Sequence, residues 1–302
     1  MFKTTIAAGA LALLAGSALA ADVPVITKAP KLPVAATPIW DVAVGGVVMS
    51  DYNFRGVSQS NRGPSAGAYF EGQYNGTFGQ LYLGLAGVSI EWPSSAAYGF
   101  TDPAAEIDFY GGWRKTWDKF SVDIGAIYYY YPKEQFNTFT SDSDFWEVYW
   151  KGGYTVNDAL TVGANVFYTP DLLNYSRTIA TASGASQDVD AIYGSLTAKY
   201  ILPWKQGDWG SYVSGELGHW WIKGGAMIAG GATADPDYTY WNAGLALTYK
   251  AMTIDLRYHG TSQSAQDCAN FLLVAAGNPA TRWCKDAFIA SLKFDTTLSA
   301  LK

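Results

Sequence analysis

Few residues of this chain have the types and spacing that catalysis requires. There are two histidines, His219 and His259, and His259 is followed closely by Ser262 and Ser264. A serine beside a histidine base could hydrolyse the acyl ester of a lipid. The sequence has neither the H-E-x-x-H motif nor a P-loop. We therefore predict a protein without enzymatic activity, and a lipid hydrolase is the alternative.

Charged residues also occur in segments that alternate between apolar and polar positions with a period of two. They include both signs: Asp51, Arg55, Glu71, Glu106, Asp108, Arg114, Asp123, Glu147, Lys151, Asp255 and Arg257. On the wall of a water-filled passage, opposed acids and bases would set a transverse field that favours small polar or zwitterionic solutes. The alternative is that these groups pair with one another and fill the passage, because buried charges need partners.

The two cysteines, Cys268 and Cys284, lie in one long segment between predicted strands. In an oxidising compartment they would form a disulfide. Closing a loop of this length would stabilise the fold by about 3 kcal/mol in the entropic model. Two unrelated free thiols are the alternative. No C-x-x-C motif and no nearby pair of histidines accompanies them, so we predict no metal site, and no motif indicates a cofactor.

The segments that carry the charged residues alternate regularly. In 120–130 the even positions are mostly apolar or aromatic, and the odd positions include Ser121, Asp123 and Gly125. The same alternation occurs in 107–114, 146–154, 160–169, 241–249 and 252–259. Aromatic side chains gather near the segment ends, as in strands that cross a bilayer between two aromatic girdles. A soluble sandwich also alternates, but charges on its inward face would be costly, so we predict a transmembrane β-barrel.

Counting such segments gives about twelve strands, an even number as in bacterial single-chain barrels. The predicted strands are 41–54, 65–75, 80–91, 104–114, 119–131, 145–154, 159–169, 188–201, 210–221, 238–249, 252–261 and 286–294. Their connections alternate in length, and outer-membrane barrels have short periplasmic turns and long extracellular loops. The prediction is an all-β, antiparallel up-and-down barrel with both termini periplasmic. The third and ninth strands have an ambiguous phase.

The composition agrees with a barrel. Aromatic residues make up 16% of the chain and charged residues 15%, and the mean hydropathy is +0.00. A neutral average is expected when a lipid-facing row alternates with a polar row. No segment after residue 20 approaches the roughly 18 to 20 consecutive apolar residues of a transmembrane helix. The net charge of -6 argues against a nucleic-acid partner, because no basic stripe could neutralise phosphates.

The two ends of the chain have their own patterns. Residues 1–20 are predicted to be a secretory signal peptide, because Lys3 precedes the apolar run 6–14 and Ala18-Leu19-Ala20 is a typical cleavage sequence. Residues 21–38 contain four prolines and are predicted to be an extended periplasmic arm. The barrel is assigned to residues 39–294, and residues 295–302 to a short C-terminal tail.

The stretch from Val47 to Ser60, with the sequence VVMSDYNFRGVSQS, resembles the N-terminal signature of the TorF family of porins. The sequences EIDFYGG at 106–112 and YYYYP at 128–132 agree in order, and the resemblance covers most of the mature chain. It implies an outer-membrane location and a pore. The chain departs from outer-membrane barrels in general at its end, because Phe294 completes an alternating strand but further residues follow.

We therefore predict a porin in the outer membrane of a Gram-negative bacterium, with a narrow channel for passive diffusion of small polar or charged solutes. About twelve strands lie between the filled barrels of eight strands and the wide channels of sixteen. A plugged barrel with a structural or adhesive role is the alternative, and the lipid hydrolase is less favoured. The predicted partners are outer-membrane lipid and lipopolysaccharide, small solutes in the lumen and the barrel assembly machinery. Monomer and homo-oligomer are both open.

Overall fold

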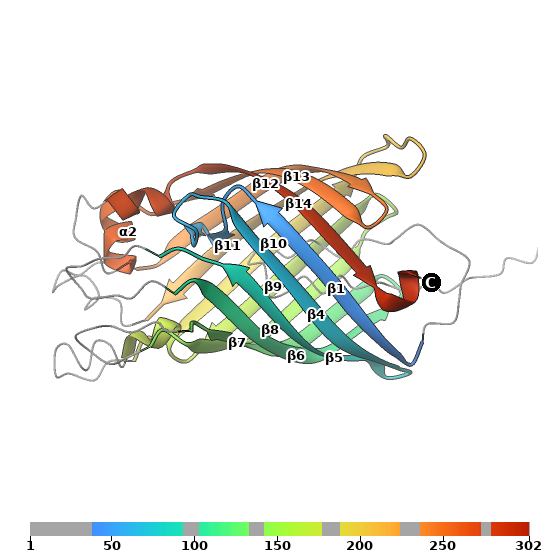
Figure 1. Ribbon diagram of the computed structural model, residues 1–302, viewed down its shortest axis with the longest axis horizontal. Coiled ribbons are helices and arrows are strands. Elements are labelled where there is room, and N and C mark those ends of the chain that lie inside the picture. Colours follow the sequence, from blue (N-terminus) through green and yellow to red (C-terminus); the bar gives the residue numbers. More distant parts are fainter. Residues whose placement is uncertain are drawn as a thin grey trace, which may run out of the picture.

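The computed structural model describes residues 38–92, 103–132, 142–176, 188–223, 236–272 and 279–301. Within these ranges, twelve strands form one closed antiparallel barrel (Figure 1). They are β1 (Trp40–Met49), β4 (Ser65–Gly76), β5 (Gly79–Ser89), β6 (Ala105–Trp117), β7 (Phe120–Tyr130), β8 (Phe145–Thr155), β9 (Leu160–Thr169), β10 (Ala191–Ile201), β11 (Trp209–Ile222), β12 (Tyr238–Tyr249), β13 (Met252–Thr261) and β14 (Ala287–Thr297). The barrel closes where β1 pairs with β14, from Ala43 opposite Thr297 to Met49 opposite Ser291. The predicted fold class is confirmed.

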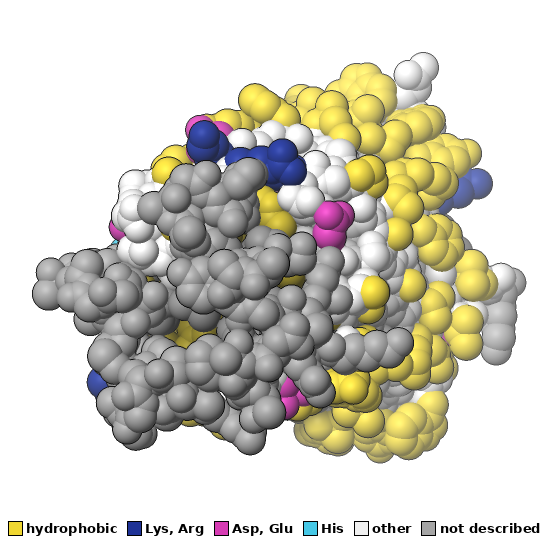
Figure 2. Space-filling model, turned by 60° about the vertical axis from the view of Figure 1, so that its left-hand side comes forward, with side chains coloured by type: hydrophobic (Ala, Val, Ile, Leu, Met, Phe, Trp, Pro, Cys, Tyr) yellow, Lys and Arg dark blue, Asp and Glu magenta, His cyan; other side chains and the backbone are white. Residues whose placement is uncertain are grey.

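The outer surface of the barrel is apolar because, on each strand, the alternating row that is rich in aliphatic and aromatic side chains points outward. Leu83, Leu196 and Leu256 are 73%, 65% and 59% exposed, and each lies near the middle of its strand. Figure 2 shows hydrophobic side chains covering the side of the barrel. Trp40 and Trp117 are exposed near one end, and Trp146 and Trp221 are exposed near the other. The outer face therefore has the apolar band and aromatic ends that a bilayer requires.

The structure resolves the two strands whose phase the sequence leaves ambiguous. On β5, Tyr82, Ala86 and Val88 are buried in the interior. On β11, Glu216 and Trp220 are buried while Leu217 and Trp221 are exposed. Glycines on β5 and β11 interrupt the contrast between large apolar and small polar side chains, and for this reason the period of two is hard to recognise there.

The connections alternate in length around the barrel. Short turns join β4 to β5, β6 to β7, β8 to β9, β10 to β11 and β12 to β13 at one end. The described C-terminus lies at this end, and α2 (Ala265–Phe271) lies at the opposite end (Figure 1). That opposite end also carries the 3-10 helices η1 (Leu172–Asn174) and η3 (Pro279–Cys284). No helix in the described ranges is long and apolar enough to cross a membrane.

Several strand boundaries differ from the prediction by one to five residues, and two of the differences change the architecture. The first strand ends at Met49 and not at residue 54, so that part of the prediction is wrong. The last strand continues to Thr297, where Asp295 and the two threonines pair with β1, and the tail is reduced to the 3-10 helix η4 (Leu298–Leu301). The predicted signal peptide and all of the predicted arm except Pro38 lie outside the described residues.

Residues 50–64, called here the inner segment, leave the barrel wall after β1 and fold into the interior. They contain a small hairpin of β2 (Asn53–Phe54) and β3 (Val57–Ser58). Tyr52, Arg55 and Val57 are almost completely buried. The turn of the hairpin needs Gly56, because its φ is +94° and a Cβ there would lie 3.1 Å from Thr261 and 3.2 Å from Tyr240. The inner segment therefore fits closely against β12 and β13.

Candidate functional site in the barrel interior

The structure places all the predicted interior residues inside the barrel. Nine come from the wall strands, and Asp51 and Arg55 come from the inner segment. All are buried except Arg257, whose side chain is 14% exposed. Their facing is thus as the sequence predicts, and their role in lining a pore stays a prediction.

Six of these residues form three ion pairs. Such pairing is the alternative to an open, charged passage that the sequence analysis describes. Arg55 donates from Nη1 and Nη2 to the two carboxylate oxygens of Glu147, each at 2.8 Å. Arg114 and Glu71 are 2.5 Å apart, and Arg257 and Asp255 are 2.9 Å apart. A bidentate arginine–carboxylate contact has two charge-assisted hydrogen bonds. Both Arg55–Glu147 and Arg257–Asp255 are bidentate, and the contact between Arg55 and Glu147 is the shorter and more deeply buried of the two.

The remaining predicted residues have different surroundings. Asp51 pairs with Arg62 at 3.2 Å, and Asp123 accepts a hydrogen bond from Tyr82. Lys151 lies directly opposite Asp123 in the register of β7 and β8, and its Nζ is 4.3 Å from the centre of the Tyr149 ring. These contacts distribute acids and bases over several strands, as a transverse field requires.

Glu106 and Asp108 are neighbours on the inner face of β6. Glu106 accepts hydrogen bonds of 2.8 Å from the hydroxyls of Tyr52 and Tyr131. Neither carboxylate oxygen of Asp108 has a hydrogen-bond partner within the described residues, and the residue is fully buried. This part of the interior consequently holds two neighbouring carboxyl groups that have no cationic partner among the described residues.

Sequence reasoning missed several charged residues of the interior. Lys199 on β10 and Glu216 on β11 are buried, and Arg62 contacts Asp51 from within the inner segment. The alternation of the tenth-strand segment places Lys199 on its polar face, which was a usable signal. Glu216 was hidden by the ambiguous phase of its strand, and Arg62 lies in a loop where no periodicity exists.

The charge state of Arg55 follows from its partner. Burial by itself lowers the pKa of the guanidinium, but the Glu147 carboxylate outweighs burial, so the pKa is raised above its ordinary value. Arg55 is therefore a permanent cation within the interior.

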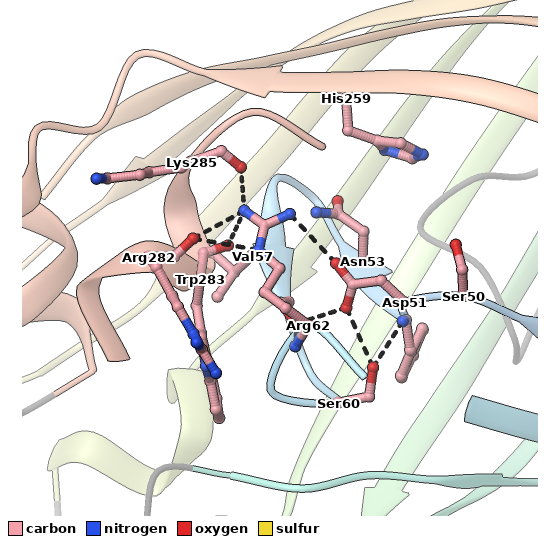
Figure 3. Close-up of polar contacts among 12 residues, drawn as sticks. Ser50, Asp51, Asn53, Val57, Ser60, Arg62, His259, Arg282, Trp283 and Lys285 are labelled. Carbon is pink, nitrogen blue, oxygen red and sulfur yellow. Dashed lines mark hydrogen bonds and ion pairs between the residues drawn. The ribbon is translucent and has the colours of Figure 1, made fainter. Parts of the chain in front are cut away.

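Arg62 joins the inner segment to the connection between β13 and β14 (Figure 3). It donates to the backbone carbonyl of Arg282 at 2.9 Å and of Trp283 at 3.0 Å, and also to that of Lys285. On its other side it donates to Asp51. One side chain therefore connects the base of the inner segment to a loop from the opposite end of the chain.

Arg62→Ala is expected to loosen the inner segment without opening the barrel. Hydrogen bonds that involve a charged group contribute about 1.5–3 kcal/mol, and every 1.4 kcal/mol is a factor of about ten. We expect amide hydrogen exchange in residues 50–64 to accelerate about 10- to 100-fold, as measured by mass spectrometry. Lys285→Ala is the matched control, because it keeps the backbone carbonyl that accepts from Arg62. Equal exchange in both variants would contradict the role given to Arg62.

The predicted disulfide between Cys268 and Cys284 is confirmed, with a Cα–Cα distance of 5.9 Å. It connects α2 to η3, and both cysteines are buried. The bond therefore fixes the loop whose backbone carbonyls receive the hydrogen bonds of Arg62.

Aromatic side chains form a continuous row around the inner wall. Tyr149, Phe167, Tyr193, Trp220 and Tyr238 are directly opposite one another on the five adjacent strands from β8 to β12. Their ring centres are 5.5 to 6.2 Å apart. All five side chains are buried, so the row is a wall of amphipathic rings that faces the interior.

Glycines provide the space for some of these rings. A Cβ on Gly218 would lie 2.3 Å from the Tyr193 hydroxyl, and one on Gly125 would lie 2.5 Å from the Tyr149 hydroxyl. The two tyrosine rings therefore lie against the backbone of the neighbouring strand and do not project across the barrel.

The residues proposed for lipid hydrolysis are engaged elsewhere. The Nδ1 atom of His259 is 3.0 Å from the Tyr240 hydroxyl. Ser262 accepts from the backbone N–H of Thr239, and Ser264 caps α2. The sequence does contain one G-x-S-x-G pattern, at 63–67, but Ser65 begins strand β4 and donates to the carbonyl of Ser89. This context differs from the strand–turn–helix geometry of a serine nucleophile.

In the described part of the chain, no cluster of three or more histidine, cysteine, aspartate or glutamate residues could hold a metal ion.

Solved β-barrel structures resemble the chain in fold at low sequence identity. A structure of the NanC porin is 10% identical with a TM-score of 0.45, and the match covers 84% of this chain and 98% of that one. A KdgM porin is 10% identical with a TM-score of 0.42, covering 83% and 98%. LpxR from Salmonella typhimurium is 8% identical with a TM-score of 0.41, covering 84% and 99%.

No curated protein matches the chain in sequence, and the specific resemblance to the TorF family stays a prediction. A family model described as "Bacterial protein of unknown function (Gcw_chp)" matches residues 35–288, and the chain belongs to this family.

Proposed function

We propose that the protein is a porin of the outer membrane of a Gram-negative bacterium and provides a narrow diffusion path for small polar or charged solutes, without enzymatic activity. The observation that carries the proposal is the contrast between the two faces of the barrel. The outer face is apolar with aromatic ends, and the inner face carries acids, bases and hydroxyl groups on most strands. Charged side chains on the inner wall of a membrane barrel can select solutes when the lumen contains water.

The direction of insertion is part of the proposal. The short turns and the C-terminal end of β14 would lie on the periplasmic side, and α2 and the disulfide would lie outside the cell. The inner segment then enters the lumen from the external end and narrows it, so we expect a small conductance. Lipopolysaccharide and phospholipid would contact the apolar band, and barrel assembly machinery would insert the chain.

Single-channel recording of the refolded protein in a planar lipid bilayer tests the function. We expect discrete, ohmic current steps, because the hydrogen-bonded strands of the closed barrel give the path fixed walls. In a salt gradient the reversal potential should indicate cation preference, since the described interior has more buried carboxylates than buried cations. A folded, heat-modifiable barrel that gives no current steps would contradict the porin proposal and support a plugged barrel with a structural or adhesive role.

A further inference from the structure

The guanidinium of Arg55 occupies a site that the barrel wall builds almost entirely. The carboxylate that binds this guanidinium belongs to Glu147 on β8, and the side chains of Arg55 and Glu147 are each 1% exposed. Three rings on the next strands surround its cationic carbon: Phe167 at 4.6 Å, Tyr193 at 4.3 Å and Trp220 at 4.7 Å. The arrangement of a carboxylate with several aromatic faces is a known means of binding organic cations.

The wall site is set by the strands and does not depend on the inner segment. Phe167 is directly opposite Tyr193, and Tyr193 is directly opposite Trp220. Glu147 also accepts a hydrogen bond of 3.0 Å from Tyr129 on β7. From the inner segment, besides Arg55 itself, Phe54 contributes a ring at 4.8 Å. Removing Arg55 would thus leave a preformed receptor on the wall.

Arg55, which occupies the wall site, lies in the inner segment and not on a barrel strand. Between β1 and β4, the inner segment is held by side-chain contacts such as Tyr52 to Glu106 and Arg62 to the loop carbonyls. Such contacts can open locally at a cost far below that of unfolding the barrel. The wall site can therefore be vacated while the barrel stays closed.

The charge around the site favours cations. In the half of the barrel that contains the inner segment, Glu106, Asp108 and Glu147 are buried. Arg114, Lys151 and Lys199 lie on β6, β8 and β10 toward the short-turn end. Arg55 is the one fully buried arginine among the described residues of this half, and Arg62 is a second, partly exposed cation that pairs with Asp51. Glu106 and Asp108 have no cationic partner among the described residues, and such carboxyl groups favour a cation over an anion in this half of the interior.

We propose that Glu147, Phe167, Tyr193 and Trp220 form a recognition site for solutes with a guanidinium head group, and that Arg55 occupies it as an internal substitute for the solute. The substrate class of the channel is accordingly small organic cations of the guanidinium type. This assignment of substrate rests on the proposed porin function, whereas the existence of the binding site does not.

The test is chemical rescue of Arg55→Ala with methylguanidinium. We expect the wild-type protein to show no saturable binding of this probe by calorimetry at millimolar concentration, because Arg55 fills the site. Arg55→Ala should bind it saturably and unfold at a higher temperature in its presence. Urea has a similar planar shape without charge and should have no such effect. In the double variant Arg55→Ala/Glu147→Gln, the affinity for methylguanidinium should fall at least tenfold.

The possible results of this experiment test the recognition site independently of the porin function. A folded Arg55→Ala barrel that binds methylguanidinium no better than the wild type would overturn the recognition site, even if the protein conducts. Saturable binding by a variant that is silent in bilayers would support the site and contradict the porin function. If Arg55→Ala does not refold alone, its refolding yield becomes the measurement: recovery with methylguanidinium and not with urea supports the proposal, and no recovery overturns it.

Discussion

Glu147→Gln is expected to release the inner segment into water while the barrel stays closed. The substitution leaves the Arg55 guanidinium buried without its anionic partner, and breaking one side of a buried ion pair costs about 3–5 kcal/mol. Arg55 can avoid this cost by leaving the interior, because the inner segment is not paired with any barrel strand over residues 51–58. The segment should therefore move out before the wall unfolds.

Trypsin measures this release, since it cleaves after an accessible arginine. At 1.4 kcal/mol per factor of ten, a change of 3 kcal/mol predicts that cleavage after Arg55 accelerates by about 100-fold or more, with the new N-terminus at Gly56. Glu106→Gln is the matched control, because it also removes a buried carboxylate that touches the segment, through the neutral hydroxyl of Tyr52. Cleavage as slow as in the wild type would show that Glu147 does not hold Arg55 in place.

Leu83→Arg tests whether the outer surface lies in hydrocarbon. Leu83 is 73% exposed in the middle of β5, where a bilayer would be driest. An arginine on the lipid face costs about 2–4 kcal/mol at the bilayer midplane and about 0–1 kcal/mol near the interfaces. We expect the free energy of unfolding in phospholipid vesicles, from urea titration followed by tryptophan fluorescence, to fall by the larger amount.

Val156→Arg provides the comparison. Val156 is exposed in the short turn between β8 and β9, at the end of the barrel. The same change of side chain should there lower the free energy of unfolding by less than about 1 kcal/mol. Equal, small effects at both positions would mean that the row containing Leu83 does not face lipid.

The outward rows could be predicted from the sequence because their physical cause is local. In β7 the apolar and aromatic residues Phe120, Ile124 and Tyr128 lie on the exposed outer face, and Asp123 lies on the buried inner face. The period of two needs no knowledge of which strands pair. For the same reason the facing of Glu71, Asp108, Arg114 and their counterparts followed directly from the rows around them.

The inner segment could not be predicted because its causes are contacts between distant residues. Nothing near Arg55 in the sequence indicates that Glu147 is its partner, and the alternation of β1 gives no signal that the chain leaves the wall at Ser50. The end of β14 has the same origin. From the sequence, Asp295 is predicted to begin the C-terminal tail. In the structure it belongs to β14, where it pairs with β1 and accepts a hydrogen bond of 3.0 Å from Tyr69.

The pairing of β1 with β14 has a consequence for how the protein is made. The strand that completes the wall, β14, is the last of the barrel strands to be synthesised. Until it arrives, β1 and β13 each present an unpaired edge, which in hydrocarbon leaves polar groups unsatisfied. Insertion would therefore wait for β14, and we expect a chain shortened before Ala287, which lacks the strand that pairs with β1, to fail to insert.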